Sequence, residues 1–128
     1  MLRRAMGAGL MLSYALALPV LAHHANAMYD HSKTVSVTGT VTRYQFINPH
    51  VGLWIDVKGQ DGNVVQWSAE FQGILDLYRN FGWNKETFKP GDTVTVIGNP
   101  ARDGTSTMAA ARVIFADGRE DDLRSSPD

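Results

Sequence analysis

The feature that most constrains the fold is a series of five segments in which apolar and polar residues alternate, separated by turn-forming sequences. The first segment, residues 34–46, places valine at positions 35, 37 and 41 and hydroxyl residues between them. This alternation predicts a strand with one buried face and one exposed face. Gly39 lies on the apolar face, and after Thr42 the large side chains change to even positions. These two features predict a bend and a β-bulge within one long strand.

The order of the remaining segments favours one fold class. We expect further strands at residues 51–57, 65–71, 93–98 and 108–115. Residues 74–81 have helical spacing, and Gly82 follows them where a helix-ending glycine is common. Three strands, a helix and two strands is the order of the OB-fold, whereas an immunoglobulin-like sandwich needs about seven strands. We therefore predict a mainly β protein, a five-stranded OB-like Greek-key barrel with one short helix between strands 3 and 4.

The N-terminus has the pattern of an export signal. Arg3 and Arg4 precede an apolar run over residues 8–21, which ends in small residues up to Ala22. The run is shorter than the ~20 apolar residues that a membrane-spanning helix needs. We therefore expect a signal peptide over residues 1–22, a periplasmic protein in a Gram-negative cell, and no membrane anchor in its mature form. Cleavage after Ala27 is the alternative.

Length and composition favour a single domain behind this signal. The chain has 128 residues, 44% of them hydrophobic, and no internal repeat, which fits one globular unit. We divide the mature chain into an N-terminal arm (23–33), the OB-like barrel (34–119) and an acidic tail (120–128). The tail is poor in apolar residues, so we expect it to be frayed.

Composition also excludes several classes of function. Cysteine is absent, which excludes disulfides and thiolate metal sites. The formal net charge is −1 and falls to −3 when the two signal arginines are removed, so nothing favours a nucleic acid or an anionic membrane as partner. No motif brings two of Asp56, Glu70 and Asp76 together as a pair for general acid–base catalysis. Ser68 lacks the flanking glycines of a nucleophile elbow. We expect no enzyme, but an exported soluble binding or accessory domain for a periplasmic protein or small ligand.

Several short motifs together resemble domain-of-unknown-function family 6152, which comprises small exported proteobacterial proteins. The motifs are Ala22-His23-His24, Tyr29-Asp30, Val37-Thr38-Gly39-Thr40-Val41, Asn48-Pro49-His50, Gly82-Trp83, Lys89-Pro90-Gly91-Asp92, Ala111-Arg112 and Asp117-Gly118-Arg119. The chain departs from the family pattern at Ala25-Asn26, where members usually have Ser-Phe. The resemblance covers nearly the whole mature chain. It implies export and an OB-like barrel, and it implies no activity.

The four histidines are the candidate metal ligands. His23, His24, His31 and His50 all lie within the first 50 residues, and imidazole is the best copper or zinc ligand in a chain without cysteine. With His23 at the mature N-terminus, its amine and ring could chelate Cu(II), and His24, His31 or His50 could supply a further nitrogen. Two alternatives remain open: the histidines are solvated or bond only to backbone, or cleavage after Ala27 removes the first two. No cofactor other than copper is expected.

A second candidate site is aromatic. Trp54 occupies a polar position of the second strand, and Tyr44, Phe46 and Trp83 could lie near the same rim. The corresponding face of OB-folds binds oligonucleotides or oligosaccharides by stacking on aromatic rings. This pattern predicts an interaction module for an oligosaccharide, peptide or protein. The alternative is that these rings form a second small core between the first strand and the helix.

Overall fold

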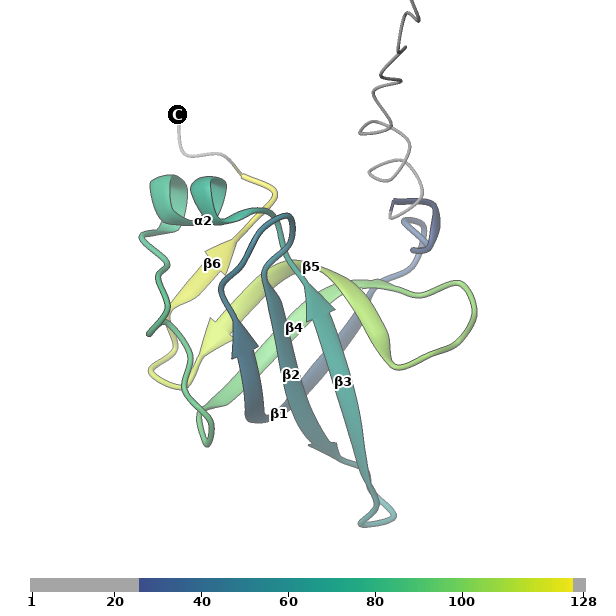
Figure 1. Cartoon of the computed structure of the whole chain (residues 1–128). Helices are drawn as coiled ribbons and strands as arrows, with labels where there is room; N and C mark the ends of the chain where they lie inside the picture. Colours follow the sequence, from purple (N-terminus) through teal and green to yellow (C-terminus); the bar gives the residue numbers. More distant parts are fainter. Residues whose placement is uncertain (1–25, 126–128) are drawn as a thin grey trace, which may run out of the picture.

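The computed structural model describes residues 26–125, so the predicted signal peptide and the last three residues lie outside the described part (Figure 1). In chain order its elements are β1 (Val35–Gln45), β2 (Gly52–Lys58), β3 (Val64–Glu70), α2 (Ile74–Phe81), β4 (Thr93–Pro100), β5 (Thr107–Phe115) and β6 (Glu120–Asp122). Hydrogen bonds connect the strands in the order β3-β2-β1-β4-β5-β6.

Pairing of β3 with β5 closes the first five strands into a barrel. This pairing is parallel and short, with Ser68 opposite Thr107 and Glu70 opposite Ala109. The other pairings are antiparallel, so the barrel is mixed. The predicted fold is thus confirmed, including the helix between β3 and β4. Gly82 ends this helix in the left-handed conformation, with φ of 70°, as its position predicted.

The first strand is long because it serves both halves of the barrel. Its first part pairs with β4 over Val35–Thr40, and its second part pairs with β2 from Thr40 onward. The register shifts between Val41 and Arg43, which is the predicted bulge. Gly39 lies so close to the neighbouring strand that a Cβ there would collide with the carbonyl oxygen of Asp56. Glycine is therefore what permits the bend.

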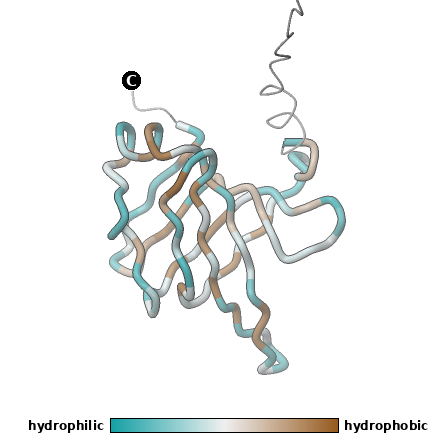
Figure 2. Tube along the Cα trace, viewed as in Figure 1, coloured by the Kyte–Doolittle hydropathy of each residue, from teal (hydrophilic) through white to brown (hydrophobic). Residues whose placement is uncertain are grey.

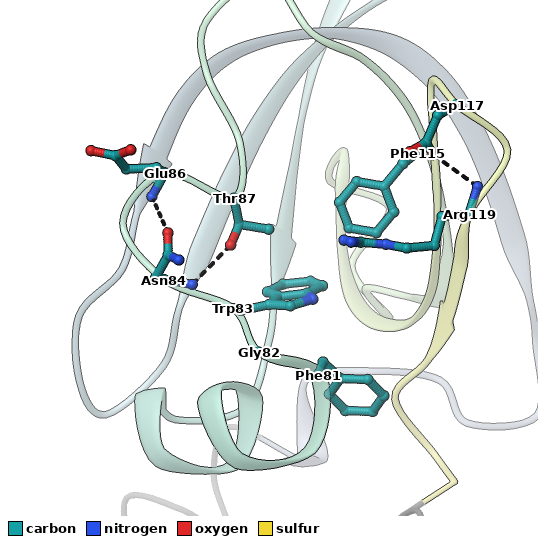
Figure 3. A pocket seen from close by; sticks show the side chains of 9 residues that line it. All are labelled: Phe81, Gly82, Trp83, Asn84, Glu86, Thr87, Phe115, Asp117 and Arg119. Carbon is teal, nitrogen blue, oxygen red and sulfur yellow. Dashed lines mark hydrogen bonds between the residues drawn. The ribbon is translucent and has the colours of Figure 1, made fainter.

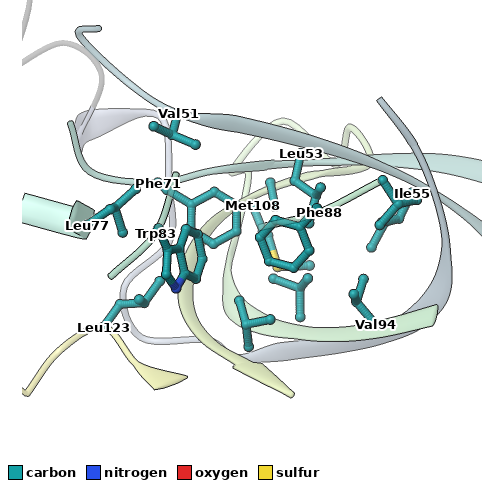
Figure 4. Packing of buried hydrophobic residues seen from close by; sticks show 14 residues of the cluster. Val51, Leu53, Ile55, Phe71, Leu77, Trp83, Phe88, Val94, Met108 and Leu123 are labelled. Carbon is teal, nitrogen blue, oxygen red and sulfur yellow. The ribbon is translucent and has the colours of Figure 1, made fainter. Parts of the chain in front are cut away.

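Alternating side chains from the strands, whose hydropathy is shown along the trace in Figure 2, fill the barrel. The helix α2 lies at one end of it (Figure 1). Figure 4 shows the packing of this core around Trp83, whose ring contacts Phe71 and Phe88 edge-on. The fully or almost fully buried residues include Val41, Val51, Leu53, Ile55, Phe71, Leu77, Trp83, Phe88, Val94, Val96, Met108, Val113 and Leu123.

Trp83 corrects one sequence-based prediction. We expected it at an accessible aromatic rim, but its side chain is 1% exposed. The turn at Gly82 directs the chain from the end of α2 into the barrel, and the indole follows it. Its Nε1 donates to Oδ2 of Asp121 at 2.7 Å, which satisfies the one polar atom of the ring. Trp83 is a core residue.

The C-terminal segment corrects a second prediction. Residues 120–122 form β6, which pairs antiparallel with β5. Arg112 forms an ion pair with Glu120, and Leu123 is 5% exposed, with its amide donating to the carbonyl of Ala111. The segment was predicted to fray because it is poor in apolar residues. Backbone pairing and a single buried leucine are enough to order it through residue 125.

Candidate functional site

The N-terminal arm lies against the barrel, a point on which the sequence was silent. Tyr29 forms an isolated bridge with Ala101. On either side of it, Arg102 N donates to the carbonyl of Met28 at 2.9 Å, and Asp30 N donates to the carbonyl of Pro100 at 2.8 Å. These bonds fix the described part of the arm to the end of β4 and the loop that follows.

The side chain of Tyr29 extends this attachment to β3. It is 4% exposed, and its hydroxyl donates to Oε2 of Glu70 at 2.9 Å. Burial, together with the adjacent carboxylate, raises the pKa of Tyr29 to about 12. The phenol therefore stays protonated and donates to Glu70 at physiological pH.

His50 lies on the other side of the same carboxylate. Its Nδ1 is 3.1 Å from the carbonyl oxygen of Phe71 and 3.5 Å from Oε1 of Glu70. A carbonyl oxygen can only accept, so Nδ1 carries the proton in the neutral ring and Nε2 keeps its lone pair. Histidines that bind metals usually donate their other ring nitrogen to a carbonyl or carboxylate in this way.

The arm and the barrel rim enclose a hollow of about 230 Å³, here called the arm hollow. Its lining consists of Asn26, Tyr29, His50, Glu70, Phe71, Gln72, Ala109 and Ala110. Asn26 and Tyr29 come from the arm, whereas the others come from the barrel and its loops. The arm hollow is thus the place where the first described residue of the chain meets His50.

A second hollow of about 200 Å³ adjoins the first, because His50 and Glu70 line both. We call it the Trp54 hollow, since the indole of Trp54 forms part of its wall. Ser68 and Thr107 also line it, and Oγ of Ser68 donates to Oγ1 of Thr107 at 2.8 Å. The Trp54 hollow combines an aromatic edge with hydroxyl and carboxylate groups.

The structure separates the four predicted histidine ligands into two groups. His23 and His24 lie outside the described residues. His31 lies on the arm, is exposed, and its Nε2 bonds to the carbonyl of Asn26 at 3.1 Å. Of the two histidines within residues 26–125, His50 lines the arm hollow and His31 does not. Within residues 26–125, no group of three histidine or carboxylate side chains is arranged to hold a metal ion.

The predicted aromatic rim does not form as one surface. Trp54 pairs with Arg43, whose guanidinium lies 4.4 Å from the centre of the indole ring. Tyr44, the next residue of β1, pairs with Leu53, which is fully buried. Consecutive strand residues point to opposite faces, so Tyr44 and Trp54 lie on opposite sides of the sheet. The indole also lies over Gly52, where a Cβ would be 2.8 Å from Cη2.

Tyr44 and Phe46 instead belong to a half-buried aromatic cluster packed against the core. Their ring centres are 6.1 Å apart, and Tyr44 meets Phe88 edge-on at 5.1 Å. The hydroxyl of Tyr44 donates to the carbonyl of Asn84 at 2.9 Å. Burial raises the pKa of Tyr44 to about 12, so the hydroxyl keeps the proton that it donates. These two residues extend the main core, and they form neither an accessible rim nor a separate second core.

A larger hollow of about 390 Å³ lies between the loop after α2 and residues 115–119 (Figure 3). Its polar groups serve the loop: Asn84 N donates to Oγ1 of Thr87 at 2.8 Å, and Glu86 N donates to Oδ1 of Asn84 at 2.7 Å. The guanidinium of Arg119 lies over the ring of Phe115 at 4.0 Å. The sequence did not indicate this hollow, because it forms between segments more than 25 residues apart.

Sequence comparison places the chain in a family. The model of a family of unknown function, DUF6152, matches residues 11–110. The chain belongs to this family. The DUF6152 match includes the arm, His50 and Glu70, so the arm hollow lies in the part of the chain that the family shares. No curated protein matches the sequence.

Two solved structures resemble this DUF6152 protein to different degrees. The mitochondrial single-stranded DNA binding protein Rim1 of S. cerevisiae superposes with a TM-score of 0.51 at 12% identity, covering 66% of this chain and 93% of that one. TiaS in complex with agmatine gives a TM-score of 0.48 at 19% identity, over 67% of this chain and 22% of TiaS. The likeness to Rim1 shows the OB-like barrel alone.

None of the helices in the described region is long and apolar enough to cross a membrane.

Proposed function

We propose that this DUF6152 protein is an exported binding domain that holds one Cu(II) ion at the arm hollow. The barrel supplies Nε2 of His50, and the arm supplies nitrogens of His23 and His24. The observation that carries the proposal is the environment of His50: its Nδ1 bonds to the carbonyl of Phe71, which leaves Nε2 free to bind a metal, and it lines the same hollow as Asn26 of the arm.

Chain connectivity supports the contribution of the arm. His24 and His23 precede Asn26 by two and three residues. An extended chain spans at most about 3.6 Å per residue, so their α-carbons lie within about 7 and 11 Å of that of Asn26. The chain is therefore short enough for either histidine to reach the arm hollow. Amine and imidazole nitrogens suit Cu(II), which binds such sites more tightly than other divalent first-row metals.

The bonds made by the arm also support cleavage after Ala22 over cleavage after Ala27. The carbonyl of Asn26 accepts from Nε2 of His31, and the carbonyl of Ala27 accepts from Nε of Arg102 at 3.1 Å. Cleavage after Ala27 would remove both acceptors. Cleavage after Ala22 would keep them and give His23 the free amine that completes a chelate ring.

The test is a Cu(II) titration of the exported protein, followed by electron paramagnetic resonance. We expect one nitrogen-coordinated Cu(II) per chain, with His23→Ala and His50→Ala both weakening binding and His31→Ala serving as the matched control. One extra residue before His23 should also weaken binding, because it converts the amine into an amide. Equal affinity for the His50→Ala and His31→Ala variants would overturn the proposed site.

A second candidate function is an interaction module for an oligosaccharide or a periplasmic protein. The observation that favours it is the Trp54 hollow, where an indole edge adjoins the hydroxyls of Ser68 and Thr107 and the carboxylate of Glu70. We expect no nucleic-acid ligand, because the mature chain is negatively charged. Trp54→Ala should abolish partner capture from a periplasmic extract and oligosaccharide binding, with the exposed Tyr78→Ala as control. Unchanged binding in Trp54→Ala would exclude this function.

A further inference from the structure

The geometry points to Glu70 as a positioning residue that links the docked arm to the metal-binding form of His50. The inference concerns the regulation of the arm hollow, so its consequence for copper rests on the proposed function. Its physical basis lies in the metal-free protein and can be tested there. Glu70 contacts no metal in this scheme, and it acts through His50.

The two oxygens of Glu70 face two different donors. Oε2 accepts the hydroxyl of Tyr29 at 2.9 Å, and Oε1 lies 3.5 Å from Nδ1 of His50. Tyr29 belongs to the arm and His50 to the turn before β2, so one carboxylate touches both sides of the arm hollow. Tyr29 is neutral there, because its pKa is raised to about 12.

A carboxylate is the side chain that satisfies both donors. A carboxylate has two acceptor oxygens and no donor, so it favours a proton on Nδ1 of His50 as well as on the Tyr29 hydroxyl. A glutamine at this position has one acceptor and one donor. If its oxygen accepts from Tyr29, its amide hydrogens face Nδ1–H, and that contact is repulsive.

Docking of the arm is consequently coupled to which ring nitrogen of His50 carries the proton. When Tyr29 is in place, it holds one oxygen of Glu70 and thereby orients the other toward His50. When the arm detaches, Glu70 is released and the imidazole keeps only the carbonyl of Phe71 as partner. By linkage, a metal that binds the Nδ1–H form of His50 also stabilises the docked arm.

The first test uses the metal-free exported protein at a pH where imidazole is neutral. Nitrogen-15 NMR of His50 should show Nδ1–H in the native protein and an increased fraction of Nε2–H in Glu70→Gln. The amides of Asp30 and Arg102, which bond across the arm–barrel contact, should exchange faster in Glu70→Gln and in Tyr29→Phe. Protection of the barrel amides would show that both variants remain folded.

The matched controls are Glu86→Gln and Tyr78→Phe, both at exposed positions away from the arm hollow. Neither should change the His50 tautomer or exchange in the arm. The inference is overturned if Glu70→Gln leaves both the tautomer and the arm exchange as in the native protein, because the carbonyl of Phe71 would then suffice. A change in one of the two readouts without the other would also overturn the coupling.

The second test measures Cu(II) affinity in the same four variants. Loss of a partner behind a metal-binding histidine typically weakens binding by about 10–100-fold, and we expect Glu70→Gln to fall in this range. Tyr29→Phe should give a smaller loss, and the two controls none. If the native protein binds no copper, the proposed function fails while the tautomer result stands. If copper binds equally to the native protein and Glu70→Gln, the role of Glu70 fails alone.

Discussion

Replacement of Leu123 by alanine tests whether the C-terminal segment is part of the folded domain. The leucine side chain is 5% exposed, and its backbone bonds to Ala111 and Gln72 through its amide and carbonyl. Leucine-to-alanine changes in cores cost about 2–5 kcal/mol, depending on how far the site can collapse. Because Leu123 directly follows the short edge strand β6, its surroundings relax easily, and we expect about 2–3 kcal/mol.

Urea unfolding followed by circular dichroism measures this loss. The midpoint should fall while the m-value stays constant, since the surface exposed on unfolding hardly changes. For a domain of this size the melting temperature should fall by roughly 10–20 °C. Leu75→Ala in α2 is the matched control: this leucine is 54% exposed, and its loss should cost under about 0.5 kcal/mol. Equal losses in the two variants would show that the segment frays in solution and would refute the argument.

Three further predictions follow from individual residues. Gly39→Ala should destabilise the protein by about 1–3 kcal/mol in urea unfolding, since the new methyl group meets the carbonyl of Asp56; an unchanged midpoint would contradict this. Hydrogen bonds from the Thr105 hydroxyl and, to a smaller extent, from the Thr105 amide lower the pKa of Asp103 below 3.8. The contribution of Asp103 to the free energy of unfolding is therefore present above pH 3.8 and is lost as the pH falls through the pKa of Asp103 in the folded protein. The difference in unfolding free energy between the native protein and Asp103→Ala should therefore shrink in acid. The intact mass of the exported protein should correspond to a chain beginning at His23, and a chain beginning after Ala27 would exclude the amine chelate.

Sequence patterns predicted the fold well where local chemistry determines it. The alternation in residues 34–46, the glycine at 39 and the change of phase after Thr42 correspond directly to the bent and bulged β1. The end of α2 was predicted equally well, because only glycine adopts the left-handed conformation at Gly82 without strain. In both cases a few residues that are neighbours in the sequence determine the local structure.

The candidate site was harder to predict because it depends on contacts between distant residues. The change of phase after Thr42 predicts the bulge that turns Tyr44 toward the core, but it does not show that Arg43 pairs with Trp54 on the outer face. The bond from Tyr29 to Glu70 joins residues 41 positions apart, and the partner of His50 is a backbone carbonyl. A carbonyl is present in every residue, so no motif marks it. The sequence pointed to the arm through its histidines and the Tyr29-Asp30 motif, but it did not indicate that Tyr29 bonds to Glu70.

The two kinds of pairing in this barrel imply an order of assembly. Strands β1, β2 and β3 form one meander and β4 with β5 forms another, so these contacts are local and inexpensive in chain entropy. Joining the meanders through β1 and β4 closes a long loop and should limit the folding rate. The parallel contact between β3 and β5 then forms between segments already held close together. Glu70 and Ala109 pair at this contact and also line the arm hollow, so we expect the hollow to be completed late in folding.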